Sequence, residues 1–319
     1  MRTTLAKIVI SISIIWLSLI GLSRLYDLAL DKNCNIKASY IQNTKIDADV
    51  LIHGPCEPLW MIYPKLLDIQ SGVKSYNLAL SHSDFADNYL HLYLYLKNNK
   101  APKYLFLFVT PESMDNKYNT FHTYRFAPYL GDPFVDSVLK ENDPEYFKWT
   151  VIPFMKYAYY SSYINFDVIQ GLKHDYDHKT VPRFADGYEP PFFRVWDNHL
   201  EEFIKIYPNG YEFQWDKLRE KYLRKIMELS QQHGIKIILY ESPVLEESFA
   251  FQPNRKEVVN RIRKVASEYG VSYVQFEGME MAKSRKYFTS PLNTSIEGSR
   301  VFTDSLGKYI RNRLLRSSQ

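Results

Sequence analysis

A cysteine stands where a nucleophile could be presented. The stretch DVLIHGPCEP, residues 49–58, runs from an apolar segment, Val50 to Ile52, through a glycine-containing turn to Cys56. A segment with helical apolar spacing follows the cysteine. A turn between a buried strand and a helix is a place where an attacking side chain can be exposed. Cys56 therefore has three interpretations: a nucleophile, one half of a disulfide, or the remnant of a lost site.

His82 is the residue that could activate this thiol. It follows a second apolar segment, Ser75–Leu80, within the run NLALSHSDFAD. An imidazolium next to a cysteine lowers the pKa of the thiol, and Asp84 or Asp87 could orient the ring. The sequence thus allows a Cys56–His82 dyad.

Plainer roles compete with this dyad. Cys56 could pack as an inert buried thiol, which is the interpretation that we rank first. It could also form a disulfide with Cys34, the other cysteine of the chain. The run His174–His178 contains metal-ligand residue types, but a contiguous polar run is more typical of a solvent-exposed loop. We therefore predict neither a metal site nor a cofactor.

The segments around these residues alternate between strand-like and helix-like patterns. The predicted strands are 50–53, 75–80, 104–109, 236–240 and 272–276, and the predicted helices are 59–69, 85–96, 212–233, 255–269 and 300–315. Alternation of this kind predicts a doubly wound parallel sheet of the α/β class, with helices on both faces. Functional residues in such sheets lie beyond the carboxyl ends of the strands, where Cys56 and His82 both fall.

One long segment interrupts the alternation. Residues 110–210 are rich in Tyr, Phe, Pro and Asp and show no clear period over most of their length. An insertion of this length is usually functional or forms a small subdomain. The chain has 26 Tyr, 19 Phe and 5 Trp, and such side chains suit interfaces and sugar-binding clefts. The net charge of +4 comes with no basic block, which argues against nucleic-acid binding.

The N-terminal residues predict membrane attachment. Residues 8–23, IVISISIIWLSLIGLS, are apolar and uncharged, and with Leu5 and Ala6 they approach the roughly 17–25 residues of a spanning helix. The alternative, a cleaved signal peptide, lacks its small-residue cleavage pattern. We expect an uncleaved anchor over residues 1–24, a polar stalk over 25–46 and an α/β domain over 47–319. Arg2 and Lys7 favour an inside N-terminus, which places the α/β domain outside the cytoplasmic membrane.

The order of the motifs resembles a known family. The sequence blocks HGPCE, YNLALSHSDFADNY, YLFLFVTPES, KIILYESP and FTSPLNTSIEGSRVFT are similar to those of SGNH (GDSL-type) hydrolases. The resemblance is nearest to the membrane-anchored branch that accompanies membrane-bound O-acyltransferases (MBOAT proteins), as in teichoic acid D-alanylation and alginate O-acetylation. It covers the α/β framework from about residue 47 to beyond Gly298 and leaves out the insertion. It implies a flavodoxin-like three-layer fold.

The resemblance also implies where a catalytic set would lie. The nucleophilic Ser of the family falls at Cys56, the oxyanion-binding Gly at His82, and the Asp and His of its last motif at Ser290 and Asn293. The oxyanion-binding Asn falls near Glu112. Each inherited catalytic position is therefore changed. Because the members of a catalytic triad act as a unit, their replacement predicts a degenerate site. The residues that we predict to contribute to binding there are Glu57, Asn77, Asp84, Asp87 and Glu112.

Three functions follow as hypotheses. The first is an extracytoplasmic pseudoenzyme that serves as an accessory or scaffold subunit in cell-envelope assembly, beside an MBOAT protein and an envelope polysaccharide. The second is an active acyltransferase or esterase that uses Cys56 and His82. The third is a structural component of a secretion or surface-filament complex.

Overall fold

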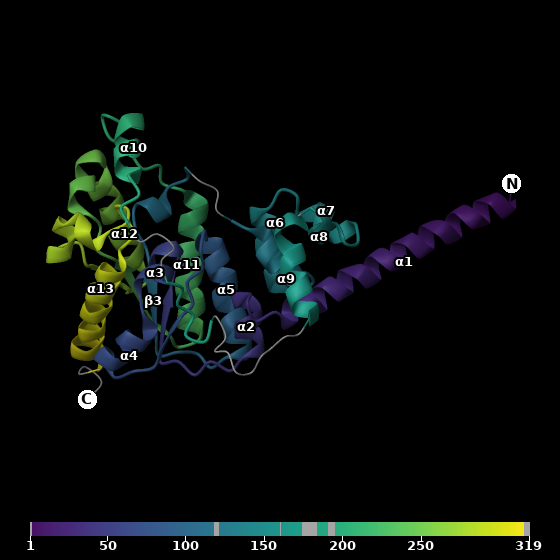
Figure 1. Ribbon diagram of the computed structural model, residues 1–319, viewed down its shortest axis with the longest axis horizontal. Helices are drawn as coiled ribbons and strands as arrows, with labels where there is room; N and C mark the ends of the chain where they lie inside the picture. Colours follow the sequence, from purple (N-terminus) through teal and green to yellow (C-terminus); the bar gives the residue numbers. More distant parts are fainter. Residues whose placement is uncertain (1, 118–120, 160, 174–183, 191–194, 316–319) are drawn as a thin grey trace. The chain divides into compact units, whose positions relative to one another are not determined.

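The computed structural model describes residues 2–117, 121–159, 161–173, 184–190 and 195–315. The chain forms two compact units (Figure 1). Unit 1 contains residues 1–44 and 122–183, and unit 2 contains residues 45–121 and 184–319.

Unit 2 is built on a five-stranded parallel sheet. The strands are β1 (Val50–His53), β2 (Ser75–Asn77), β3 (Tyr104–Phe108), β4 (Lys236–Glu241) and β5 (Ser272–Gln275), in the spatial order β2-β1-β3-β4-β5. The register places Ile52 beside Asn77 on one side and Phe106 on the other. This order is that of flavodoxin-like sheets, and it confirms the predicted α/β class with a parallel sheet.

Helices flank the sheet in the same unit. They are α3 (Cys56–Met61), α4 (Pro64–Ser71), α5 (Phe85–Asn98), α10 (His199–Ile206), α11 (Lys217–Gln232), α12 (Arg255–Glu268) and α13 (Ile296–Tyr309). Helix α13 packs against α4, and α5 packs against α11 (Figure 1). All five residues of β3 are buried, as expected for a strand that is covered on both faces.

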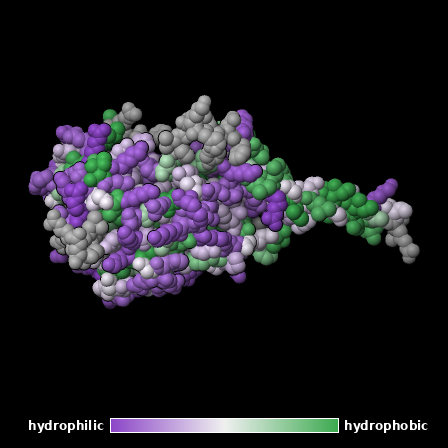
Figure 2. Space-filling view, turned by 90° about the horizontal axis from the view of Figure 1, so that it is seen from below, coloured by the Kyte–Doolittle hydropathy of each residue, from purple (hydrophilic) through white to green (hydrophobic). Residues whose placement is uncertain are grey.

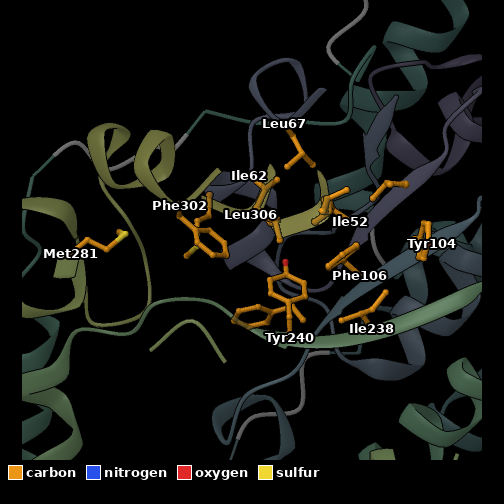
Figure 3. Packing of buried hydrophobic residues seen from close by; sticks show 14 of the residues in the cluster. Ile52, Ile62, Leu67, Tyr104, Phe106, Ile238, Tyr240, Met281, Phe302 and Leu306 are labelled. Carbon is orange, nitrogen blue, oxygen red and sulfur yellow. The ribbon is translucent and has the colours of Figure 1, made fainter. Parts of the chain in front are cut away.

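The core of unit 2 lies between the sheet and these helices. Ile52, Phe106 and Tyr240 come from three adjacent strands and meet Phe302 and Leu306 of α13 (Figure 3). Each of these five side chains is fully buried. The sheet is therefore a rigid support for the loops that leave its strand ends.

Several helices begin or end at other residues than predicted, because of a proline and of N-cap side chains. The predicted helix 59–69 is divided into α3 and α4, because Pro64 lacks the N–H that would continue α3 and instead begins α4. The predicted helix 212–233 begins only at Lys217, since Asp216 accepts hydrogen bonds from the N–H groups of Leu218 and Arg219 as an N-cap.

The last helix differs in the same way. It begins at Ile296 rather than at residue 300, because Ser295 caps it by accepting a hydrogen bond from Gly298 N–H. The distorted turn Ile310–Leu315 follows it.

Unit 1 is helical. It contains α1 (Arg2–Lys32), α2 (Lys37–Asn43), α6 (Pro133–Asn142), α7 (Tyr146–Val151), α8 (Met155–Ala158) and α9 (Ser161–Lys173). Helix α9 packs against α1, and the buried side chains Ala29, Leu30, Tyr157, Ile164 and Val168 form the core of this unit. Among the described residues, α1 is the helix whose length and apolar composition would allow it to cross a membrane.

Residues 25–46 differ from the predicted polar stalk. They complete α1 and form α2, and they bury Ala29, Leu30 and Ile41. Asp27 holds this segment in unit 1, since its Oδ1 lies 2.7 Å from Lys156 Nζ and also accepts a hydrogen bond from the Tyr157 hydroxyl. Helix α1 therefore continues beyond residue 24 and buries apolar side chains in a segment whose polar residues had predicted a stalk.

Candidate functional site

A cavity of about 320 Å³ lies at the carboxyl ends of β1, β2 and β3. Its lining residues come from the turn after β1, the loop after β2, the segment after β3, and the region around α10 and the start of α11. The residues are Pro55, Cys56, Glu57, His82, Ser83, Asp84, Phe85, Asn88, Thr110, Glu112, Ser113, Asp115, Lys117, Phe203, Tyr211, Phe213 and Arg219. In a sheet of this order, the order in which the strands are added along the chain reverses between β1 and β3. Ligands bind at this point in doubly wound folds. We refer to this space as cavity 1.

Gly54 creates the turn that presents Cys56. Its φ is +144°, and a Cβ at this position would lie 2.7 Å from Cβ of Phe108 and 2.9 Å from Cγ of Pro58. Only glycine fits there without a shift of its neighbours. The chain can therefore pass close to β3 and begin α3 at Cys56 itself.

The thiol of Cys56 receives a backbone hydrogen bond. The N–H of His82 lies 3.1 Å from Cys56 Sγ, and Ser81 Oγ lies 3.5 Å from the same sulfur. His82 has a φ of +48°, the left-handed conformation that glycine adopts most easily, and its side chain is exposed. The backbone at His82 thus has the shape expected of the glycine that the resemblance places there. Both cysteines are free thiols, so the predicted alternative of a Cys34–Cys56 disulfide is wrong for this structure.

Glu57 and Glu112 are a second chemical feature of cavity 1. They follow the adjacent strands β1 and β3, and the Oε2 atom of each is buried without a hydrogen-bond partner in the described part of the chain. Burial, with the charge of Glu112 as a smaller cause, raises the pKa of Glu57 from 4.5 to about 7. Burial also raises the pKa of Glu112, against the opposing effect of Arg255. At neutral pH this pair can therefore hold or release a proton.

Three of the predicted binding residues hold the loops of the site in place. Asn77 donates to the carbonyls of Pro58 (2.8 Å) and Ile62 (3.1 Å), which fixes the end of β2 to α3. Asp84 and Asp87 form a capping box at the start of α5, and Asp84 also lines cavity 1. Asn77 and Asp87 are absent from the lining of cavity 1, so these contacts give them a positioning role.

Ser290 and Asn293 line a second cavity that adjoins cavity 1. This second cavity, of about 310 Å³, is bordered by Leu200, Gln252 and the segment Ser290–Asn293, and it shares Glu112, Phe203 and Phe213 with cavity 1. Asn293 Nδ2 donates to Ser290 Oγ at 3.0 Å, and the buried Oδ1 of Asn293 has no partner among the described residues. The structure therefore groups Cys56, Glu57 and His82 around one cavity and places Ser290 and Asn293 around the other.

The sequence did not reveal the cationic and aromatic side chains that line cavity 1. Lys117 Nζ lies 4.5 Å from the ring centre of Tyr207 and 4.6 Å from that of Tyr211, within the range of cation–π attraction. Arg219 lines the same cavity and donates to the Ser113 carbonyl at 3.0 Å. The alternation of aromatic residues at Tyr211 and Phe213 was the sequence feature that could have indicated this lining.

The histidine-rich run 174–178 lies outside the described residues. Among the residues that the structure describes, no group of three or more His, Cys, Asp or Glu side chains is arranged to hold a metal ion.

The sequence matches no protein-family model and no curated protein. Two solved structures are similar to the chain. One, from Streptococcus pneumoniae and provisionally named as a platelet activating factor, has 12% identity and a TM-score of 0.45 over 96% of this chain and 99% of its own. The other, from Bacteroides fragilis and provisionally named as an acylhydrolase, has 10% identity and a TM-score of 0.37 over 86% of this chain and 93% of its own. At these values neither likeness assigns a family or an activity to the chain.

Proposed function

We propose that this chain is a membrane-anchored, extracytoplasmic pseudoenzyme of the SGNH type. In this proposal it serves as an accessory or scaffold subunit of a cell-envelope assembly, beside an MBOAT O-acyltransferase that modifies a polysaccharide. The motif order, the flavodoxin-like strand order and the apolar helix α1 support this reading.

One observation carries the loss of catalysis. The positions at which the family has its general base and orienting acid are Asn293 and Ser290, and these two side chains are hydrogen-bonded to each other. Neither group can accept a proton from a nucleophile near neutral pH. They line the second cavity, which shares Glu112, Phe203 and Phe213 with the cavity of Cys56. Without a base, a Ser–His–Asp type of acyl transfer loses most of its acceleration.

The test is turnover of activated acyl esters by the purified full-length protein. We expect the same background rate for the parent protein and for Cys56→Ala. Ester hydrolysis that disappears in Cys56→Ala would overturn the proposal. The accessory role is tested separately: the protein, isolated from its own membranes in mild detergent, should co-purify with an acyltransferase identified by mass spectrometry.

A second candidate function is favoured by the geometry of Cys56. The thiol lines cavity 1 together with Glu57 and Glu112, and it receives the His82 N–H hydrogen bond. A thiolate at that point could attack an acyl donor if a neighbouring group took its proton. This alternative is an acyltransferase or esterase that uses the Cys56–His82 dyad.

The variant His82→Gly separates the two candidates. Glycine keeps the left-handed backbone and its N–H while removing the imidazole. If the imidazole activates Cys56, alkylation of the thiol by iodoacetamide will become slower in His82→Gly than in the parent protein. If only the backbone matters, the alkylation rate will be unchanged. The control is His233→Ala, which removes an exposed imidazole elsewhere in unit 2.

A further inference from the structure

Helix α9 of unit 1 has two apolar sides. Ile164 and Val168 are buried against α1, as expected for packing between the helices. Phe166, Ile169 and Leu172 are three residues apart and are 67%, 51% and 51% exposed. Residues with this spacing lie on one side of a helix. We refer to these three residues as the outer face of α9.

Leu172, at the end of the outer face, is next in sequence to the point where α9 contacts α1. A Cβ on Gly171 would lie 1.9 Å from the Ala29 carbonyl oxygen, so the backbones of α9 and α1 are in direct contact there. The neighbours of this contact are Leu172 on α9 and Leu28 on α1, and Leu28 is also exposed. Figure 2 shows hydrophobic side chains along α1, with further ones gathered next to its base.

The length of α1 determines how far the contact between Gly171 and Ala29 lies from the hydrocarbon core of a bilayer. A bilayer core is crossed by about 20 helical residues. Counted from Leu5, the first large apolar residue of α1, such a span ends near Arg24, only a few residues before Ala29. At roughly 1.5 Å per residue, Ala29 is then less than about 10 Å beyond the hydrocarbon core, in the headgroup region.

The groups around this level suit a membrane interface. Tyr26 contacts Phe154 edge to face with 4.9 Å between ring centres, and its hydroxyl donates to Asn165. Aromatic residues with a polar tip and basic residues such as Arg24 are enriched at the boundary between lipid and water. A contiguous exposed apolar surface is unfavourable in water and marks an interaction site.

We propose that the outer face of α9 lies in the interfacial layer of the bilayer that α1 crosses, so that unit 1 is a membrane-resting platform. This inference rests on the proposed membrane anchoring. The partner surface is lipid rather than a protein, because the contact between Gly171 and Ala29 brings this face to the level at which the apolar span of α1 ends. Helices with one buried and one lipid-facing apolar side can lie in the interface in this way.

The experiment uses the full-length protein in vesicles that contain no other protein. Both cysteines are replaced by serine, and an environment-sensitive fluorophore is attached to a single new cysteine in each variant. The three variants are matched: Ile169→Cys on the outer face, Ile14→Cys in α1 and Ile69→Cys on α4 of unit 2. All three isoleucines are exposed, at 51%, 58% and 72%. Circular dichroism checks that each variant keeps the helix content of the parent.

The expected result is quenching by spin-labelled lipids at positions 14 and 169 and no quenching at position 69. If position 169 behaves like position 69 while position 14 is quenched, the platform is wrong and the anchor stands. That outcome would favour a protein partner on the outer face. If position 14 is also unquenched, the membrane anchoring fails and this inference fails with it.

Discussion

At the level of single residues, cavity 1 combines a thiol with two carboxyl groups. The turn at Gly54 presents Cys56, whose sulfur accepts a hydrogen bond from His82 N–H. Glu57 and Glu112 line the same cavity, and the Oε2 atom of each is buried. Asn293 and Ser290, which the resemblance aligns with a base and its orienting acid, bond to each other. In the proposed function, any proton transfer in cavity 1 therefore involves groups other than these two.

Glu57 makes stability depend on pH. Its pKa is raised by burial to about 7 in the folded chain, compared with about 4.5 when unfolded. The folded state therefore binds the proton more tightly, and stability falls as the pH rises from about 4.5 to about 7. The raised pKa predicts a loss on the order of 3 kcal/mol across this window. Glu57→Gln, which is neutral at every pH, should remove this part of the loss.

The measurement is the free energy of unfolding from urea titrations at pH 5 and pH 8. We expect the difference between the two values to shrink in Glu57→Gln and to stay as in the parent in Glu280→Gln, an exposed control. An equal pH difference in Glu57→Gln and in the parent would show that Glu57 is ionised in the folded chain at pH 5 as well.

At the level of elements, the edge of the sheet depends on a returning segment. Asn77 N–H donates to the Asp186 carbonyl at 3.0 Å, and the Tyr76 hydroxyl donates to the Phe184 carbonyl at 3.1 Å. These bonds cover β2, which would otherwise expose unpaired backbone groups. The same segment supports α3, since Glu189 N–H donates to the Leu59 carbonyl. The segment therefore stabilises both the sheet edge and the turn that holds Cys56.

Gly187 allows this close approach. Its φ is +76°, and a Cβ there would lie 1.9 Å from the Asn77 carbonyl oxygen. Gly187→Ala should lower the free energy of unfolding of unit 2 by more than the roughly 1–2 kcal/mol that left-handed strain alone costs an L-residue. Gly234→Ala is the matched control, because Gly234 has a φ of +68° and open space around it.

The same urea titration reads both glycine variants. If Gly187→Ala lowers the free energy of unfolding by the same amount as Gly234→Ala, the contact with Asn77 relaxes freely. The returning segment then does not hold the sheet edge. A larger cost, with a looser start of α3, is the expected result.

For the whole molecule, the proposed tasks of membrane attachment and ligand binding fall in different units. Unit 1 contains α1 and the outer face of α9, and unit 2 contains the sheet and both cavities. This division differs from the predicted arrangement of anchor, stalk and one domain with an insertion over 110–210. The described residues between 122 and 173 belong to unit 1 with the N-terminal helices, while those between 184 and 210 belong to unit 2. The middle segment is thus shared between the two units.

The proposed orientation predicts where unit 2 is accessible. Arg2 and Lys7 precede the apolar stretch, which favours an inside N-terminus and an outside unit 2. In a background without the two native cysteines, Lys283→Cys should react with a membrane-impermeant maleimide on intact spheroplasts. Lys283 is suitable because its side chain is 58% exposed. Labelling that requires lysis of the cells would place unit 2 in the cytoplasm and exclude an extracytoplasmic role.

The sequence by itself determined the parts of this protein that short segments encode. Buried runs such as 104–108 form strands wherever they are covered on both faces, and their alternation with helices sets a parallel sheet. The turn that contains Gly54 and Cys56 could also be identified there. Strand ends in a parallel sheet meet at one edge, so the approximate place of the site followed.

Only the tertiary structure decided which side chains meet. Glu57 and Glu112 are separated by more than fifty residues, and their shared burial depends on the pairing of β1 with β3. The aromatic contacts of Lys117 and the packing of α1 against α9 depend on segments still farther apart. Such proximity is set by the packing of the whole core rather than by any local propensity, because each side chain's environment consists of distant parts of the chain.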